Sequence, residues 1–372
     1  MRKKTLGKIK RLVVKIGSTL LFSKTEGIDP GRVHTITSQV TALTKKGIWV
    51  VLVSSGAIAC GMKLLGLRNR PRRLPELQAA AAVGQAKLMK LYDEDLRHKG
   101  LLTSQILLTQ DDLQQKKRYW NARNTLLALL RFGAIPIVNE NDTVATEEIR
   151  FGDNDRLSSL VACLIGADLL VILSDVDGLY RNFRKSEGKE ILDVVERIGS
   201  DIEEMASEDK GEFSTGGMKT KLQAAKLATG AGIPVVIANG RKKDTLLKIV
   251  SGETVGTLFL PKTDRMGARK SWIAFTSRPG GKVVVDEGAK SALLHHGRSL
   301  LSSGIVAAKE EFAVGEVVSI VDQKGTEFAR GLINYSSKEI EKIRGQRSDR
   351  IHVLLGYKTY DEVIHRDNMV IL

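Results

Sequence analysis

Two clusters of acidic and amide side chains could bind a small charged molecule. They are Asn139-Glu140-Asn141-Asp142 and, further along the chain, Phe151-Gly152-Asp153-Asn154-Asp155-Arg156. Carboxylates bind an ammonium group, and side-chain amides can donate hydrogen bonds to a carboxylate. The same residues would also suit two solvated loops, with an Asx turn and a helix cap at Asp153 or Asn154. The clusters by themselves leave both interpretations open.

Lysines and glycines elsewhere in the chain point to phosphate. The segment Ser214-Thr215-Gly216-Gly217-Met218-Lys219-Thr220-Lys221 opens a predicted helix, where free backbone N–H groups can bind an anion and Lys221 adds a positive charge. Its spacing is not that of a Walker A loop, and an ordinary capped helix is the alternative. Lys15, near the end of an apolar run, is either an edge residue that reaches water or a functional cation. Phosphoryl transfer needs positive charge on both sides of the phosphate, which Lys15 and Lys221 could supply.

The histidines lie away from these groups. His34 and His98 fall on helical patterns, and His295, His296, His352 and His365 belong to the C-terminal part of the chain. No Ser-His-Asp or Cys-His pairing is indicated. A reaction without a general base fits better, because a substrate carboxylate, with a pKa of about 4, is ionised at neutral pH and is already a nucleophile.

Alternating apolar strands and amphipathic helices must position these residues. Strands are expected at 11–16, 48–53, 102–108, 134–138, 169–173 and 234–238. Helices are expected at 30–46, 75–99, 119–132, 157–165, 198–206 and 218–229, and a polar hairpin or loop at 181–189. This alternation predicts a doubly wound α/β domain with a mainly parallel sheet and helices on both faces.

In doubly wound folds, ligands bind at the carboxyl ends of the strands. The polar groups that follow the predicted strands are Lys15 to Gly17, Ser54-Ser55-Gly56, Asn139 to Asp142, Ser174-Asp175 and Asn239-Gly240. Because all of them lie at strand ends, we expect an enzyme or a binding domain rather than a structural protein.

The C-terminal part has a different pattern. A basic connector runs from about 263 to 278, and short apolar runs follow at 280–286, 304–306, 312–315 and 316–321, separated by Gly and Asp turns. These runs predict a small β-barrel-like domain. We therefore expect one domain at 1–262, a linker at 263–278 and a second domain at 279–372.

Composition narrows the classes of protein. The formal net charge is +15, but residues 279–372 contain 13 Lys+Arg and 13 Asp+Glu, so the surplus lies in 1–278, where phosphate would bind. Cys60 and Cys163, without metal-ligand spacing, are expected to be buried thiols of a cytosolic protein. No apolar run is long enough to span a membrane, and Lys15 and Gly17 interrupt the run that a signal peptide would need.

A series of motifs resembles the glutamate 5-kinase family, which has the amino acid kinase fold. Across 1–260 they are Lys15-Ile-Gly-Ser-Thr, Ser54-Ser-Gly-Ala-Ile-Ala, Gln78-Ala-Ala-Ala-Ala-Val-Gly-Gln85, Asn139-Glu-Asn-Asp142, Phe151-Gly-Asp-Asn-Asp155, Ser174-Asp175 with Gly178-Leu-Tyr180, and Thr215-Gly-Gly-Met-Lys-Thr-Lys221. The tail resembles a PUA domain in Asp286-Glu-Gly-Ala289, Gly297-Arg-Ser-Leu-Leu301, Ala329-Arg-Gly-Leu332, Asn334-Tyr335 and His365-Arg-Asp-Asn368.

The resemblance implies an enzyme that transfers the γ-phosphoryl group of ATP to the side-chain carboxylate of L-glutamate, the first step of proline biosynthesis. It implies that Lys15 and Lys221 stabilise the transferring group and that Asp155 orients them. Ser55, Asp142 and Asn154 would hold glutamate, with Asp153 nearby. The nucleotide site would comprise Lys15, Ser174, Asp175, Thr215, Gly216, Gly217, Met218, Lys219, Thr220 and Lys221.

The resemblance also implies Mg²⁺ bound with ATP, inhibition by proline, homodimers or homotetramers and a cytoplasmic location. The acyl phosphate product suggests a handover to glutamate-5-semialdehyde dehydrogenase. The sequence does not indicate which carboxylate, if any, touches Mg²⁺. The chain departs from the family pattern at Leu77, where Lys is usual, at Ser214, where Gly is common, and at Cys60, where a small residue is usual.

Two other functions fit parts of the sequence. A related kinase of the same fold could act on aspartate or N-acetylglutamate, although Asp142 favours a substrate with a free amine. A PUA domain could bind RNA, but the zero net charge of 279–372 argues against it, because nonspecific nucleic-acid affinity comes mostly from neutralising phosphates.

Overall fold

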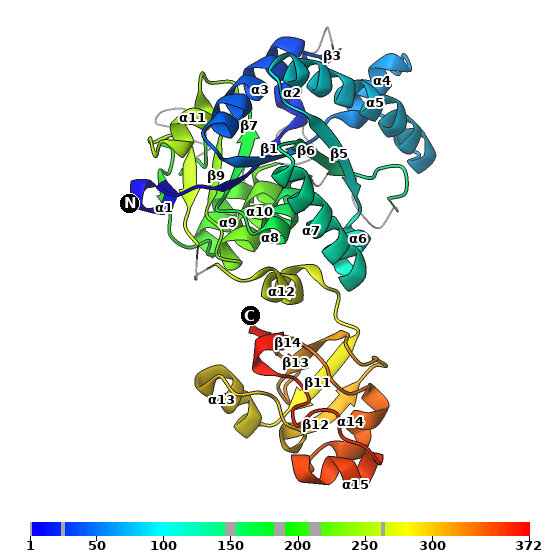
Figure 1. Ribbon diagram of the computed structural model, residues 1–372. Helices are drawn as coiled ribbons and strands as arrows, with labels where there is room; N and C mark the ends of the chain where they lie inside the picture. Colours follow the sequence, from blue (N-terminus) through cyan, green and yellow to red (C-terminus); the bar gives the residue numbers. More distant parts are fainter. Residues whose placement is uncertain (1, 24–26, 146–153, 182–189, 208–216, 262–264) are drawn as a thin grey trace. The chain divides into compact units, whose positions relative to one another are not determined.

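The computed structural model describes residues 2–23, 27–145, 154–181, 190–207, 217–261 and 265–372. The chain divides into two compact units, Met1–Met266 and Gly267–Leu372 (Figure 1). No helix among these described residues is both long enough and apolar enough to cross a membrane.

An eight-stranded sheet forms the centre of the first unit. Its strands, in spatial order, are β5 (Thr103–Leu108), β6 (Ile135–Glu140), β4 (Trp49–Ser54), β1 (Arg11–Ile16), β7 (Leu169–Ser174), β9 (Val235–Asn239), β10 (Thr257–Phe259) and β8 (Val194–Val195). The strands from β5 to β9 are all parallel, whereas β10 runs antiparallel to β9. The predicted doubly wound, mainly parallel sheet is confirmed.

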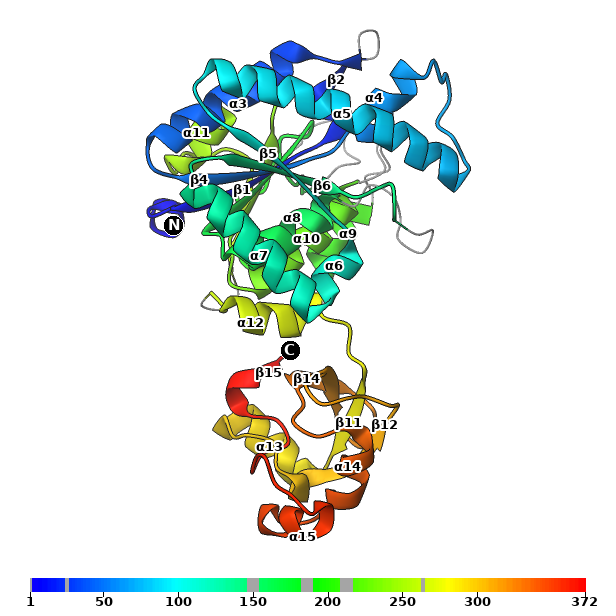
Figure 2. The ribbon, with the colours of Figure 1, turned by 45° about the vertical axis from the view of Figure 1, so that its right-hand side comes forward.

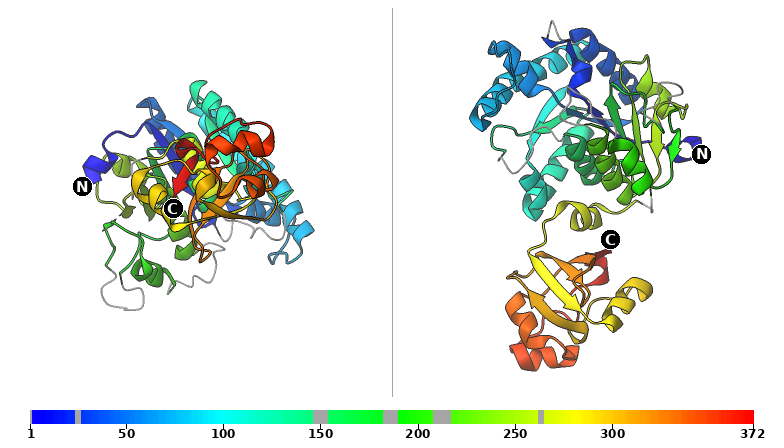
Figure 3. Two further views of the ribbon diagram at one scale, coloured as in Figure 1. Left: turned by 90° about the horizontal axis from the view of Figure 1, so that it is seen from below. Right: turned by 180° about the vertical axis from the view of Figure 1, so that it is seen from behind.

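Helices cover both faces of this sheet (Figure 2). One face carries α3 (Pro30–Lys45), α5 (Leu74–His98) and α11 (Thr245–Val250), and the other carries α7 (Lys116–Arg131), α8 (Asn154–Ile165) and α10 (Met218–Gly230). The view from behind in Figure 3 shows the same two layers, with blue and cyan helices on one side of the sheet and green helices on the other.

The alternation of side chains along β1 explains where Lys15 points. Successive residues of a strand face opposite sides of the sheet. Leu12, Val14 and Ile16 belong to the apolar core that includes residues of α3 and α5. Lys15 therefore faces the layer of α8. Since β1 lies between β4 and β7 in the middle of the sheet, the alternative that Lys15 reaches water from an edge strand is wrong.

The short elements of the first unit surround this framework. They are α1 (Arg2–Leu6), α2 (Ser18–Leu21), β2 (Phe22–Ser23), β3 (Gly27–Ile28), α4 (Ala57–Leu64), α6 (Gln110–Gln114) and α9 (Ser200–Ser207). Of these, only α9 was expected from the sequence, as the helix at 198–206. Residues 182–189 of the expected hairpin lie outside the described residues, but Arg181 N donates to Glu190 O at 2.9 Å, so its two flanks pair.

The second unit is built on a five-stranded sheet. Its strands, in spatial order, are β12 (Ile305–Lys309), β11 (Gly281–Val285), β13 (Val317–Val321), β14 (Glu327–Leu332) and β15 (Met369–Ile371). The helices that follow the start of this sheet are α13 (Glu287–His296), α14 (Ser337–Ile343) and α15 (Ile351–Leu355). The core contains residues from these strands and helices, including Val283, Leu293, Ile320 and Ile340.

Two segments of the C-terminal part differ from their expected structure. The run 312–315 was expected to be a strand, but it forms a turn in which Gly315 has φ +83° and Val314 is exposed. Phe312 is nevertheless buried, so its apolar character serves packing rather than strand pairing. The region expected as a linker contains α12 (Ala268–Ser271) and a π-helical turn (Trp272–Thr276), and Arg330 of β14 donates to the carbonyl oxygen of Ala274.

Candidate active site

A pocket in the first unit collects most of the expected site residues. It lies at the carboxyl ends of β1, β4, β6 and β7, beside the first turns of α8 and α10. The expected residues that line it are Lys15, Ser55, Asp142, Asn154, Asp155, Ser174, Asp175 and Lys221. Further lining residues are Gly17, Ser18, Thr19, Gly56, Ala57, Ile58, Ala59, Arg70 and Asn139.

The centre of the pocket is a carboxylate between two ammonium groups. Lys15 Nζ lies 2.6 Å from Oδ1 of Asp155, and Lys221 Nζ lies 3.6 Å from Oδ2 of the same side chain. Thr220 donates from Oγ1 to this Oδ2 at 2.8 Å. All three charged side chains are buried. Asp155 therefore positions two cations from different layers of the fold, Lys15 from the sheet and Lys221 from α10.

The protonation of this centre follows from its surroundings. Burial by itself would raise the pKa of the Asp155 carboxyl, but the charges of Lys15 and Lys221 and the hydrogen bonds from Lys15 and Thr220 hold that pKa below its usual value. Burial lowers the pKa of the Lys221 ammonium, and the attraction of Asp155 opposes this effect. One carboxylate between two cations leaves a surplus of positive charge, which favours binding of a phosphate.

Only some side chains of the first turn of α10 reach the pocket. Lys221 enters the pocket, and Thr220 contacts Asp155. Met218 is buried, and Lys219 is exposed and lines a separate surface hollow between α9 and α10. Gly217 precedes the helix without a side-chain cap, so backbone N–H groups of the first turn could bind an anion. Asp153, Thr215 and Gly216 lie outside the described residues.

A chain of amides on the other side of the pocket links the ends of β4 and β6 to the start of α8 and to α5. Asn154 donates from Nδ2 to Ser55 Oγ and to Asn139 Oδ1, each at 3.0 Å. Asn139 in turn donates to Gln85 Oε1 at 2.8 Å. These acceptors determine the orientation of the Asn154 amide. Its Oδ1 is buried and has no hydrogen-bond partner among the described residues.

This arrangement changes the expected role of Asn154. The sequence suggested that its amide donates to a substrate carboxylate. In the structure the Nδ2 group already donates within the protein, whereas Oδ1 is the atom that lacks a partner among the described residues. An acceptor of this kind suits an ammonium group, because an ammonium has only donors.

Asp142 supplies the second carboxylate of the pocket. Its side chain is buried, and this burial raises its pKa to about 6, against the opposing influence of the nearby positive charge of Arg70. A buried carboxylate gains stability when a cation binds beside it. The position is therefore suited to an amine, as the sequence predicted, but the involvement of Arg70 was not foreseen. Arg70 lies in a polar loop whose path the sequence pattern does not indicate.

The turn after β4 depends on a glycine. Gly56 has φ +113°, a conformation that residues with a Cβ atom rarely adopt, and a Cβ there would lie 2.6 Å from the ring of Phe22. The glycine allows Ser55 and the first residues of α4 to approach the same pocket.

The turn after β7 is held by side-chain hydrogen bonds. Ser174 donates from Oγ to Asp175 Oδ1 at 3.1 Å, and Asn239 donates to the carbonyl of Asp175 at 3.3 Å and to Asp177 Oδ1 at 2.9 Å. Asn239, at the end of β9, thus shapes the loop that lines the pocket without lining the pocket itself.

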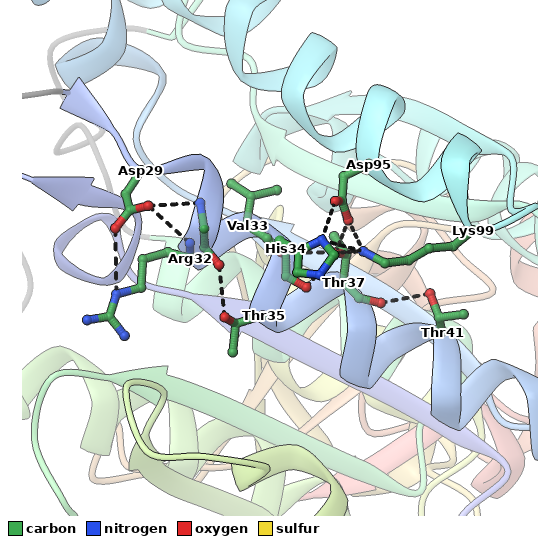
Figure 4. A network of polar contacts seen from close by, with 10 residues as sticks. Asp29, Arg32, Val33, His34, Thr35, Thr37, Thr41, Asp95 and Lys99 are labelled. Atoms are coloured by element: carbon green, nitrogen blue, oxygen red, sulfur yellow. Dashed lines mark hydrogen bonds and ion pairs between the residues drawn. The ribbon is translucent and has the colours of Figure 1, made fainter.

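None of the six histidines, all of which are described, lines the pocket. His34 instead bonds through Nδ1 to Asp95 Oδ1 at 2.8 Å, and Thr37 and Lys99 contact the other oxygen of Asp95 (Figure 4). Burial would raise the pKa of Asp95, but the hydrogen bonds from these neighbours lower it to about 2. This network ties α3 to α5 and has the character of a structural contact between helices.

The described residues include no group of three or more His, Cys, Asp or Glu side chains that could hold a metal ion. Asp155 is already paired with two lysines. The donor set therefore fits a divalent ion that arrives on the phosphates of a nucleotide better than one held by the protein alone.

Comparisons with known proteins agree with this geometry. Residues 10–239 match the amino acid kinase family, and residues 281–355 match the PUA domain. The chain is 48% identical to the glutamate 5-kinase of Geobacter sp. (strain M21) over 373 aligned residues, which cover 100% of both chains. It is 47% identical to the glutamate 5-kinase of Caldanaerobacter subterraneus subsp. tengcongensis, with 97% of this chain and 98% of that protein covered.

Among solved structures, carbamate kinase from Giardia lamblia bound to AMP-PNP is similar with a TM-score of 0.51 at 18% identity. The similarity covers 68% of this chain and 99% of that one, and at this identity it speaks for the fold alone. The full-length similarity, together with the two domain matches, shows that the chain belongs to the glutamate 5-kinases, enzymes of the amino acid kinase family that carry a C-terminal PUA domain.

Proposed function

We propose that this kinase transfers the γ-phosphoryl group of ATP to the side-chain carboxylate of L-glutamate, forming L-glutamyl 5-phosphate in the first step of proline biosynthesis. The observation that carries the proposal is the buried Lys15–Asp155–Lys221 centre in a pocket that also contains Asp142. The names of the full-length relatives, glutamate 5-kinases, support the choice of substrate.

In this proposal the chemistry needs charge and position rather than a base. A glutamate side-chain oxygen forms a bond to the γ-phosphorus while the bond from that phosphorus to the bridging oxygen of ADP breaks. Lys15 and Lys221 stabilise the negative charge on the transferring group. Asp155 keeps both ammonium groups in place and accepts no proton. The absence of histidine from the pocket lining fits this mechanism, because the attacking carboxylate is already ionised.

The glutamate end of the pocket is assigned by charge. Asp142 would bind the α-ammonium group, and Oδ1 of Asn154 would accept a hydrogen bond from it. Ser55 and the turn at Gly56 would lie beside the reacting groups. Asp153 is assigned to the glutamate site from the family resemblance alone.

The nucleotide would lie between the turn after β7 and the start of α10. Ser174, Asp175, Gly217 and Lys221 are the described residues that we assign to it, with Thr215 and Gly216 from the resemblance. Met218 is buried and would support the site by packing beneath it. Thr220 would act through its hydrogen bond to Asp155, and the exposed Lys219 would lie at the rim of the site. Mg²⁺ would be bound with the ATP phosphates and would neutralise part of their charge.

Regulation and assembly extend the proposal. Proline would compete with glutamate, because its ring nitrogen and carboxylate resemble the α-carbon groups of glutamate. A homodimer or homotetramer is proposed from the family resemblance, and the exposed leucines at the end of α4 and just after it, Leu64, Leu65 and Leu67, would be available to such an interface. The reactive acyl phosphate would pass to glutamate-5-semialdehyde dehydrogenase.

RNA binding by the PUA domain is not favoured, because the net charge of 279–372 is zero.

We also propose a cytoplasmic location. Its support is that Cys60 and Cys163, the two cysteines of the chain, are both free and buried, as in a reducing compartment.

The test is the amino-acid dependence of ADP formation by the purified full-length protein with ATP and Mg²⁺. Glutamate should support turnover, and hydroxylamine should trap the acyl phosphate product. Aspartate, N-acetylglutamate and a reaction without an amino acid are the controls. ADP release that depends on one of the other acceptors and not on glutamate would refute the proposed substrate.

A further inference from the structure

One cation in the pocket is not explained by phosphoryl transfer. The segment between α4 and α5 carries Arg68, Arg70, Arg72 and Arg73, and of these four only Arg70 lines the active-site pocket. The sequence gives no reason to single it out, because all four arginines lie in one polar, exposed loop. The folded structure therefore brings one guanidinium group of this basic segment, that of Arg70, to the pocket.

The positively charged side chains of the pocket differ in whether they form ion pairs. Lys15 and Lys221 both pair with Asp155 at the phosphoryl end. Arg70 forms no ion pair with another described residue, although its charge is close enough to act on the buried carboxylate of Asp142. Asp142 likewise has no direct ion pair among the described residues. The pocket thus contains one carboxylate and one guanidinium that face a common space without neutralising each other.

An α-amino acid carries complementary charges, since its ammonium and carboxylate groups are attached to the same carbon atom. We propose that Arg70 binds the α-carboxylate of glutamate while Asp142 binds the α-ammonium group, so that the side-chain carboxylate extends toward Lys15 and Lys221. This inference rests on the proposed function. The planar guanidinium of arginine can donate two parallel hydrogen bonds to a carboxylate, which a lysine cannot do. Arg70 is then the residue that selects acceptors with a free α-carboxylate.

The experiment compares two acceptors. Glutamate and its α-amide (L-isoglutamine) have nearly the same shape and the same reacting carboxylate, but the α-amide lacks the negative charge that Arg70 would bind. Steady-state ADP formation is measured with both acceptors for the full-length wild-type chain, Arg70→Ala, Arg70→Lys and the matched control Arg68→Ala. Where turnover of the α-amide is too slow, its inhibition constant against glutamate replaces kcat/KM.

We expect Arg70→Ala to lower kcat/KM for glutamate by about 10- to 100-fold, mainly through KM, because a hydrogen bond between charged groups contributes roughly 1.5–3 kcal/mol. The α-amide should be used equally well by the wild type and Arg70→Ala. Arg70→Lys should restore part of the activity with glutamate, and Arg68→Ala should match the wild type with both acceptors. The KM for ATP should be unchanged in every variant.

Three results would overturn the assignment. An equal loss with glutamate and with the α-amide would make Arg70 a support of the loop rather than a contact of the α-carboxylate. A raised KM for ATP with unchanged glutamate kinetics would place Arg70 on the nucleotide phosphates. Wild-type kinetics in Arg70→Ala would leave it a surface residue. A wild-type chain without glutamate-dependent turnover would instead overturn the proposed function and, with it, this assignment.

Discussion

Replacing Asp155 with asparagine tests the charged centre most directly. The substitution preserves the shape of the side chain but removes the negative charge between Lys15 Nζ at 2.6 Å and Lys221 Nζ at 3.6 Å. Relative exposures of 2% for Asp155, 6% for Lys15 and 7% for Lys221 mean that water from the pocket can replace the lost partner only in part. Breaking a buried ion pair in this way costs about 3–5 kcal/mol. At roughly 2–4 °C per kcal/mol for a unit of this size, the melting temperature should fall by about 6–20 °C at pH 7.

Two further variants separate this effect from general damage. Asp155→Asn combined with Lys221→Met removes the repulsion between the two ammonium groups, so the double variant should regain part of the stability without regaining activity. Glu203→Gln breaks an exposed ion pair with Lys226 and should change the free energy of unfolding by less than about 1 kcal/mol. The measurements are thermal unfolding and kcat with glutamate.

The pH dependence gives a further check. The folded-state pKa of Asp155 lies below its usual value, so its stabilisation is present above the unfolded pKa of about 4 and is lost as the pH falls through the folded-state pKa. The difference in melting temperature between wild type and Asp155→Asn should therefore shrink in acid. Equal melting temperatures at pH 7, or a difference that grows as the pH falls, would refute the reasoning.

Three other predictions concern single residues. Lys221→Ala should lower kcat by about 100-fold or more, because a cation aimed at the transferring group contributes several kcal/mol, whereas Lys226→Ala on the exposed side of α10 should not; normal turnover in Lys221→Ala would remove it from the mechanism. With Asp142 at a pKa of about 6, kcat/KM for glutamate should decline as the pH falls below about 6, since the ammonium needs an ionised partner, and this decline should be absent from the pH profile of Asp142→Asn. Arg2 donates to four backbone carbonyls, including that of Val255 at 2.8 Å, so Arg2→Leu should cost about 2–4 kcal/mol in thermal unfolding, whereas Lys4→Leu on the exposed side of α1 should be nearly neutral.

The parallel sheet was readable from the sequence because its strands are buried on both faces. Such strands appear as continuous apolar runs, and β1, β4, β6 and β7 were expected within one or two residues of their observed bounds. The edge of the sheet formed by β10 and β8 could not be predicted from the sequence. β10 and β8 are only three and two residues long, which is too short for a pattern, and nothing in the sequence between β9 and β10, which contains α11, indicates that β10 runs antiparallel to β9.

Part of the active site could likewise be predicted from the sequence and part could not. The polar groups after the strands could be located because every parallel strand delivers its carboxyl end to the same edge of the sheet. Which atoms of those groups are already engaged could not be deduced, since hydrogen bonds between residues as distant as Asn154 and Ser55 depend on the packing of α8 against β4. The orientation of the Asn154 amide, and hence its suitability for an ammonium group, follows from those contacts.

The sequence by itself determined the fold class, the ordered motifs and the position of Lys15 next to a strand end, because these depend on periodicity and residue type. The family resemblance already grouped Asp155 with Lys15 and Lys221, but the tertiary structure alone decided the distances and the burial of these three side chains, and that Arg70 rather than Arg68 enters the pocket. The physical reason is that charge interactions depend on distance and burial in space. Residues that are far apart along the chain acquire these properties only when the sheet and its helices have packed together.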